Sequence, residues 1–150
     1  MLRLFKLIGV ALAAAFVVGQ AHAEKPAIFT GLLSNTAVDG FDVVSVFEGN
    51  GTKGSSEFTT SYNGAEWRFT SQENLDRFNA NPTAFAPQYG GYCAWAVAQG
   101  YTAKGDPRYA RVVDGKLYLN FNADVQNKWL ADVPGFIAKA DTNWPGVLSE

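Results

Sequence analysis

The chain has 150 residues, of which 47% are hydrophobic, and its 12 basic and 14 acidic residues give a net charge of −2. That size fits one ordinary domain with a core of its own. A chain without a strong basic patch does not suit a phosphate backbone, so we expect no nucleic-acid partner.

The N-terminus has the pattern of a secretory signal. Arg3 and Lys6 precede the short apolar run LIGVALAAAFVV, and the small residues of AHA end at Ala23. This order predicts cleavage after Ala23 and a periplasmic or secreted protein. The run is too short for a membrane span, which takes about 20 residues, so no span is expected after cleavage. The alternative is an uncleaved anchor at the membrane surface.

Loss of residues 1–23 would remove most of the residues that usually carry side-chain chemistry. His22 and Met1 are the only histidine and methionine, and Cys93 is the only cysteine. The mature chain would then have 10 basic and 14 acidic residues, a net charge of −4. Without histidine it cannot form a Ser-His-Asp or Cys-His catalytic group, or a histidine metal site. One cysteine also excludes an internal disulfide.

The first half of the mature chain predicts a β-hairpin followed by a helix. Asn63-Gly64 suits a type I′ turn between alternating apolar residues, which gives a hairpin over 57–71. Thr70 is the expected helix cap, and the helix should end before Pro82 because a residue before proline avoids helical geometry. The other expected segments are a leader at 24–36, a strand or short helix at 37–47, a loop at 48–57 and a turn at 82–89.

The second half predicts the same kinds of element. Asp114-Gly115 is the turn of a hairpin over 110–120. The other expected segments are a short helix at 92–99 ended by Gly100, a helix at 122–133 capped by Asn122, and a last helix at 134–141. We expect an α+β fold with one compact domain at 37–145, a tail at 146–150 and no internal repeat.

Cys93 is the first candidate for chemistry. In the first turn of a helix, its thiolate would be stabilised by the helix dipole and by free N–H groups. The candidate binding residues around it are Gly90 and Gly91, which open the backbone to close approach, and Tyr89, Tyr92 and Trp95. The alternative is plain burial, since free cysteine is among the most buried residue types.

Carboxylates and aromatic residues are weaker candidates. Glu73 with Asp76, and Asp39 with Asp42, are close enough in sequence to pair, but solvated acids are the usual case. Four tryptophans and six tyrosines are available to line a ligand groove, although large aromatic residues more often fill a core.

Three segments resemble the small secreted bacterial YHS-domain proteins: VDGFDVVSVF, the run from Tyr62 to Gly100, and VDGKLYLNFNADVQNKWLADVPGFIAKADTNWP. The resemblance covers about residues 37–145. It implies a compact α+β fold and an association with heavy metals, notably copper. It also implies relatives that carry selenocysteine, which we expect at the position of Cys93.

The departures from the family pattern lie at its metal ligands. Where the family has a YHFCS-like segment, this chain has WRFTS, with Trp67, Arg68 and Thr70 in place of tyrosine, histidine and cysteine. The family's ligand set therefore does not carry over, and Cys93 is the one soft ligand left.

Three functions remain open, and no residue spacing specifies a class of enzyme. The first is a single-thiol redox or thiol-binding module, in which Cys93 forms either a mixed disulfide or a sulfenic acid that an outside thiol resolves. The second is a copper-binding accessory protein, in which either a homodimer shares two Cys93 thiolates or oxygen and backbone donors complete the site. The third is a non-catalytic domain that binds a peptide or a small apolar ligand.

Overall fold

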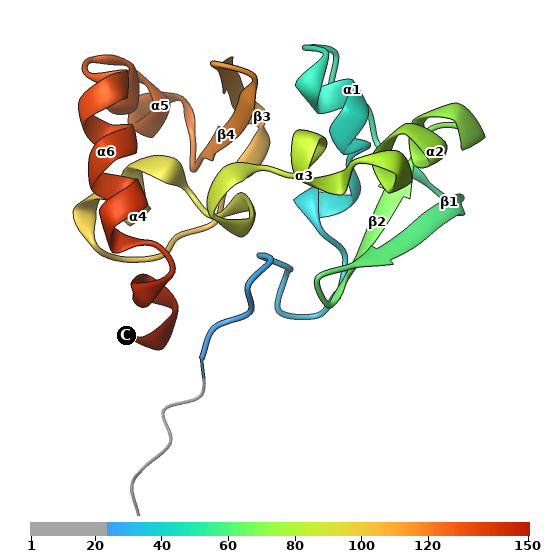
Figure 1. The fold of residues 1–150 in the computed structure, drawn as a ribbon, viewed down its shortest axis with the longest axis horizontal. Coiled ribbons are helices and arrows are strands. Elements are labelled where there is room, and N and C mark those ends of the chain that lie inside the picture. The colour runs from blue at the N-terminus through green and yellow to red at the C-terminus, as the bar shows by residue number, and fades with distance from the viewer. Residues whose placement is uncertain (1–23) are drawn as a thin grey trace, which may run out of the picture.

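Two groups of helices and strands lie side by side in the computed structural model, which describes residues 24–150 (Figure 1). One group holds α1 to α3 with the hairpin β1–β2, and the other holds α4 to α6 with the hairpin β3–β4. The expected signal segment, residues 1–23, lies outside the described residues. Within the described part, no helix is long and apolar enough to cross a membrane.

Six helices and four strands make up the two groups, which confirms the α+β prediction. The elements of the first group are α1 (Val43–Phe47), β1 (Ser55–Tyr62), β2 (Ala65–Phe69), α2 (Gln72–Ala80) and α3 (Pro82–Phe85). Those of the second are α4 (Ala94–Gln99), β3 (Asp106–Val113), β4 (Lys116–Asn120), α5 (Ala123–Leu130) and α6 (Val133–Asn143). Residues 24–150 also contain three 3₁₀ segments: η1 (Val38–Gly40), η2 (Gln88–Gly91) and η3 (Gly146–Ser149).

Turn and cap residues correctly predicted most of the helices and hairpins, with two exceptions. Both predicted hairpins form, and Asn122 caps α5 by accepting the Val125 N–H at 2.9 Å. The cap of α2 is Ser71, whose Oγ accepts the Asn74 N–H, and not Thr70 as predicted. Pro82 does not begin a turn but the short helix α3, because proline is well accommodated at the first helical position.

The prediction of no internal repeat is wrong, because the second group repeats the first at a constant separation along the chain. We call this separation, from Ser55 at the start of β1 to Asp106 at the start of β3, the repeat offset. The strand β4 follows β2 at the same offset, and each hairpin has an irregularity at the same place, at 55–59 and at 106–110. Isolated bridges join Phe41 to Lys53 and Tyr92 to Lys104. The two groups are therefore two copies of one unit.

Backbone geometry repeats in the same way. Among the described residues, all positive-φ positions form pairs at the repeat offset: Val38 and Tyr89, Asp39 and Gly90, Gly40 and Gly91, Gly49 and Gly100, Asn63 and Asp114, and Gly64 and Gly115. A side chain at Gly54 or at its counterpart Gly105 would overlap neighbouring backbone. Because the same unusual backbone conformations recur in both units, the two units share a backbone fold even though most of their side chains differ.

The second hairpin separates the two cores. In β2, Trp67 and Phe69 enter the first core, and the alternate residues Glu66 and Arg68 are half-exposed. In β4, Leu117 and Leu119 pack into that same first core, whereas Tyr118 packs into the second core beside Trp129. Because β4 is buried on both faces, it joins the two units into one body.

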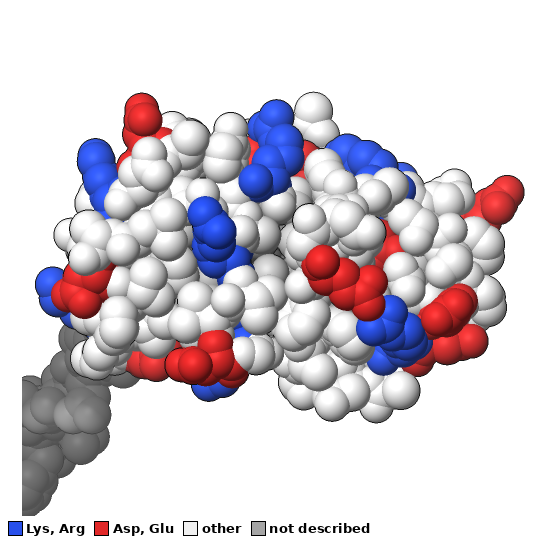
Figure 2. Space-filling view, turned by 90° about the horizontal axis from the view of Figure 1, so that it is seen from above, with Lys and Arg blue, Asp and Glu red and all other residues white. Residues whose placement is uncertain are grey.

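The leader ties the units together along one side (Figure 1). In the second unit the Gly90 carbonyl accepts the Phe29 N–H at 2.8 Å, and in the first unit the Glu66 N–H donates to the Asn35 carbonyl of the leader at 2.8 Å. A Cβ at Gly90 would overlap the carbonyl oxygen of Ala27. On the face in Figure 2, acidic and basic side chains alternate over both units without a patch of one sign.

We expect Gly90→Ala to lower the free energy of unfolding by about 2–3 kcal/mol, because it adds a backbone overlap to a strained positive φ. Gly64→Ala is the matched control, since Gly64 also has positive φ but faces open space, and its cost should be about 1 kcal/mol. Urea unfolding of both variants measures the difference. Equal losses would show that the leader does not press on Gly90.

Candidate functional site

Cys93 lies at the start of α4, directly before its first residue, and its side chain is buried with 1% exposure. The sequence predicted a position in the first turn; the structure places it one residue earlier, at the N-cap. The backbone amides of Trp95 and Ala96 in α4 and of Phe121 after β4 act on the sulfur in favour of its thiolate. The sulfur therefore lies in a closed but polar pocket.

Burial controls the ionisation of this thiol. Removal from water raises the pKa of Cys93, and the hydrogen bonds from Ala96, Phe121 and Trp95 oppose that rise without cancelling it. The thiol is therefore protonated at neutral pH. This is the reverse of the thiolate that we expected from the helix start alone.

Asn120 is the polar neighbour that the sequence analysis missed. It is fully buried at the end of β4, and its Oδ1 lies 3.6 Å from the Cys93 sulfur and 3.2 Å from the Trp95 nitrogen. The Asn120 Nδ2 has no hydrogen-bond partner within residues 24–150. An unpaired buried amide is costly, so this pocket is not optimised for stability alone.

Asp42 occupies the same place in the first unit that Cys93 occupies in the second. It caps α1, and its Oδ1 accepts the N–H groups of Val44 at 2.9 Å and Ser45 at 3.1 Å. Its Oδ2 accepts three more hydrogen bonds, from the Thr70 N–H, the Thr70 hydroxyl and the Asn74 amide, all at 2.8–2.9 Å.

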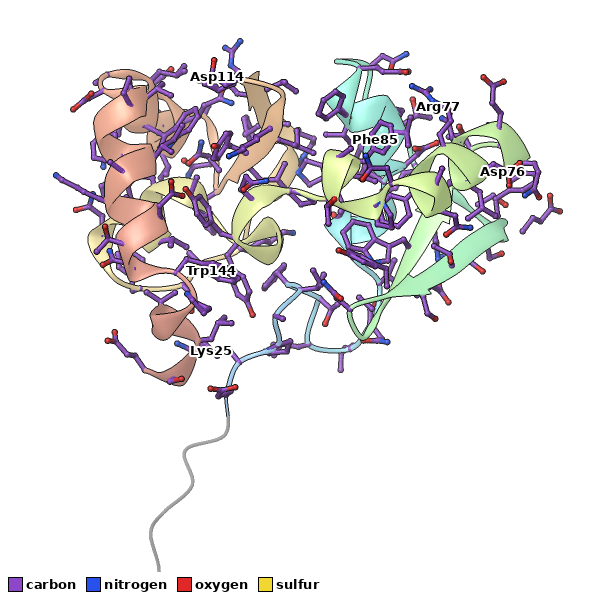
Figure 3. All side chains as sticks on the ribbon, in the orientation of Figure 1. Lys25, Asp76, Arg77, Phe85, Asp114 and Trp144 are labelled. Carbon is purple, nitrogen blue, oxygen red and sulfur yellow. The ribbon has the colours of Figure 1, made fainter. Side chains whose placement is uncertain are left out.

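The two pockets treat charge differently. Burial acts to raise the pKa of Asp42, but the bonds from Asn74, Thr70 and Ser45 outweigh it and hold that pKa below its usual value. The expectation that the acids are solvated is therefore wrong for Asp42, which is fully buried. It holds for Glu73 and Asp76, which are exposed on α2 (Figure 3 labels Asp76).

The other predicted binding residues surround Cys93 along the chain, but they face different ways. Gly90 packs on the leader and lines a cavity of about 400 Å³ with Tyr89 and Trp144, and a Cβ added to Gly91 would lie 3.3 Å from the Pro87 side chain. The Tyr89 hydroxyl donates to Asp141 at 2.8 Å inside the second core. Trp95 is half-buried beside Tyr101, at 6.4 Å between rings.

An apolar groove of about 500 Å³ opens on the other side of Tyr92. The leader forms one wall with Phe29 and the fully exposed Leu32, and the segment 102–104 forms the other. Lys25 and Lys104 are its charged residues. Of the expected aromatic groove residues, Trp67 and Trp129 instead fill the cores.

No cluster of three or more histidine, cysteine, aspartate or glutamate side chains suited to a metal ion occurs among residues 24–150. Cys93 has the Asn120 amide as its side-chain hydrogen-bond partner. Metal binding through Cys93 accordingly stays a prediction.

We expect Asp42→Asn to lower the free energy of unfolding by about 3 kcal/mol at pH 7, because its amide would face three donors. The lowered pKa of Asp42 means that its stabilisation is present above the unfolded pKa and is lost as pH falls through the folded one. The gap between wild type and variant should therefore narrow below about pH 4. A gap of constant size in pH-dependent urea unfolding would contradict this.

Comparison with known proteins identifies part of the first unit. The model of the YHS domain family matches residues 43–89, which run from α1 into η2. No curated protein and no solved structure matches the chain. The chain therefore contains a YHS domain at residues 43–89.

Proposed function

We propose that this chain is a non-catalytic binding domain whose ligand site is the apolar groove beside Tyr92. The observation that carries the proposal is that the groove is accessible to solvent and the Cys93 sulfur is not. The groove is open and has a volume of about 500 Å³, within the usual range for small-molecule sites, whereas the Cys93 sulfur is enclosed.

The groove walls suit an apolar chain. Phe29 packs edge-on against Tyr92 at 5.3 Å between ring centres, and the Tyr92 hydroxyl donates to the Pro26 carbonyl at 2.8 Å. These contacts fix the floor, so little ordering is needed when a ligand binds. Leu32 projects fully into solvent, and covering it would recover about 1.5–3 kcal/mol.

The charges of the groove select one end of the ligand. Lys25 and Lys104 line it, and none of the described residues that line it is acidic. Lys25 already donates to the Glu150 backbone oxygen at 2.6 Å, and Lys104 is only 4.0 Å from Asp39, an exposed and weak pair. Lys104 is therefore the groove cation that can turn to an anionic headgroup. The ligand class is a small amphiphile with an apolar chain and a carboxylate.

The apolar wall is tested with dodecanoate as the probe. Leu32→Asp should weaken dodecanoate binding by tenfold or more, because it removes apolar contact and repels the carboxylate, and about 1.4 kcal/mol corresponds to tenfold. Leu33→Asp is the matched control, since Leu33 is as exposed but does not line the groove. Isothermal titration calorimetry measures both. No binding to wild type, or equal losses, would refute the groove as the site.

The headgroup is tested by comparing dodecanoate with dodecanol. Lys104→Gln should weaken dodecanoate binding by about three- to tenfold and leave dodecanol unchanged, because only the carboxylate loses a charged partner. Lys53→Gln is the control, since Lys53 is the counterpart of Lys104 in the first unit and lies outside the groove. Equal loss for both ligands would show that the charge selects nothing.

A second candidate is the single-thiol module, which the polar surroundings of Cys93 favour. A cysteine that only fills space needs no hydrogen bonds, yet three N–H groups and the Asn120 amide meet this sulfur. Such a thiol would form a mixed disulfide by exchange with the disulfide of a partner in a periplasmic or extracellular compartment, which breaks the partner's S–S bond and releases one partner thiol. Copper is the metal with which the YHS family is associated, and a copper ion held between the Cys93 thiolates of two chains would require the same exposure of the sulfur.

Labelling kinetics decide whether the thiol is reached in the folded protein. With a small methanethiosulfonate reagent, a plain buried cysteine should react only as fast as the chain unfolds, so its rate should rise steeply with urea. We expect this result, since the sulfur is enclosed and protonated. A rate that is independent of urea at low concentration would show native-state access and would favour the thiol module instead.

A further inference from the structure

We infer that residues 94–140 are a second YHS unit, the counterpart of residues 43–89, in which a carboxylate pocket has been rebuilt to hold a neutral thiol positioned by Asn120. The family model matches only the first unit. This inference goes beyond the groove and does not depend on it.

The units correspond in their cores as well as in their backbone. Trp67 and Phe78 pack at 5.0 Å between rings in the first unit, and their counterparts Tyr118 and Trp129 pack at 5.5 Å in the second. The caps of α2 and α5, Ser71 and Asn122, are also separated by the repeat offset. Both units therefore place an aromatic pair between the second strand and the helix that follows it.

The backbone part of the pocket is the same in both units. The N–H groups of Val44, Ser45 and Thr70 point to the Asp42 carboxylate. The backbone amides that favour the Cys93 thiolate are those of Trp95, Ala96 and Phe121, which are the counterparts of these three residues at the repeat offset, and the Trp95 N–H donates to the Asn120 Oδ1 beside the sulfur at 3.2 Å. A pocket of three N–H donors is thus a property of the unit, and each copy fills it with a different acceptor.

The side-chain part of the pocket has changed. Thr70 and Asn74 donate two further hydrogen bonds to Asp42, and their counterparts Phe121 and Val125 have no side-chain donor to offer. In exchange, the position of Phe69 is taken by Asn120, whose Oδ1 faces the sulfur. An amide oxygen accepts a hydrogen bond from a thiol but repels a thiolate, so these replacements favour the neutral form.

The inference gives Asn120 a positioning role. Its Oδ1 accepts both from the Cys93 thiol and from the Trp95 N–H, which fixes the sulfur at the start of α4. The cost of this arrangement is the Nδ2 group, which is fully buried and has no partner in the described part of the chain. A residue kept only for packing would be apolar, as Phe69 is in the first unit.

The test rebuilds the first pocket in the second unit. Cys93→Asp alone should place a carboxylate where only backbone donors meet it, so its folded pKa is raised and stability falls as pH rises from about 4 to about 7. Adding Phe121→Thr and Val125→Asn restores the donors of Asp42, so the folded pKa is lowered, and stability should instead rise with pH below about 4 and stay level above it. The folding equilibrium constant should change by about tenfold for each unit by which the folded pKa moves.

Cys93→Asn, with and without the two added donors, is the control, because it has the size of aspartate and does not titrate. Its pH profile is subtracted from that of the matching aspartate variant. The same sign of pH dependence with and without the added donors would overturn the inference, as would failure of the aspartate triple variant to fold when the asparagine triple variant folds.

A second measurement covers the case in which none of these variants folds. Phe121→Thr with Val125→Asn in the wild-type Cys93 background changes two positions that are not buried. The added donors should lower the thiol pKa, followed by thiolate absorbance in the ultraviolet. An unchanged or higher thiol pKa would overturn the correspondence of the two pockets.

Discussion

Each unit of this protein has to supply an acceptor for three N–H groups that converge inside the fold. A helix begins beneath the end of a hairpin, so two N–H groups of its first turn and one from the chain after the hairpin are closed off from water. Buried donors without partners cost about as much as a lost hydrogen bond. The residue before the helix meets this demand, as Asp42 in one unit and Cys93 in the other.

The same constraint explains why the only cysteine can be both buried and surrounded by polar groups. A carboxylate satisfies the donors best, but in a closed pocket it needs further partners to offset its loss of hydration. Asp42 has them in Thr70 and Asn74. A thiol accepts more weakly and loses less on burial, which suits a pocket with fewer donors. Cys93 is thus the acceptor in the unit that lacks side-chain donors at the positions of Thr70 and Asn74.

Turn and cap residues made the helices and hairpins predictable from the sequence. The burial of Asp42 and the internal repeat were not predictable in this way. Asn63-Gly64 and Asp114-Gly115 fix their hairpins through local backbone preference, which a sequence displays directly. The repeat is hidden because identical residues at the repeat offset are few and several of them are glycines, such as Gly64 and Gly115. The burial of Asp42 was missed because its donors lie 28 and 32 residues away, at Thr70 and Asn74.

Divergence of the two units also accounts for the groove. In the first unit, the Lys53 amine lies 4.7 Å from the centre of the Phe41 ring and pairs with Asp39. The Lys53 side chain therefore covers the Phe41 ring, at the place where the groove lies in the second unit. In the second unit the counterpart of Asp39 is Gly90, and the leader packs where a side chain would be.

The leader then stands beside the second bridge and forms a wall opposite Tyr92 and Lys104. Without an acidic residue at the position of Gly90, Lys104 keeps a 4.0 Å contact to Asp39 across the units. The difference between aspartate in the first unit and glycine in the second thus leaves room for the leader and leaves a cation available at the same time. The binding site that we propose is a consequence of how the second copy departed from the first.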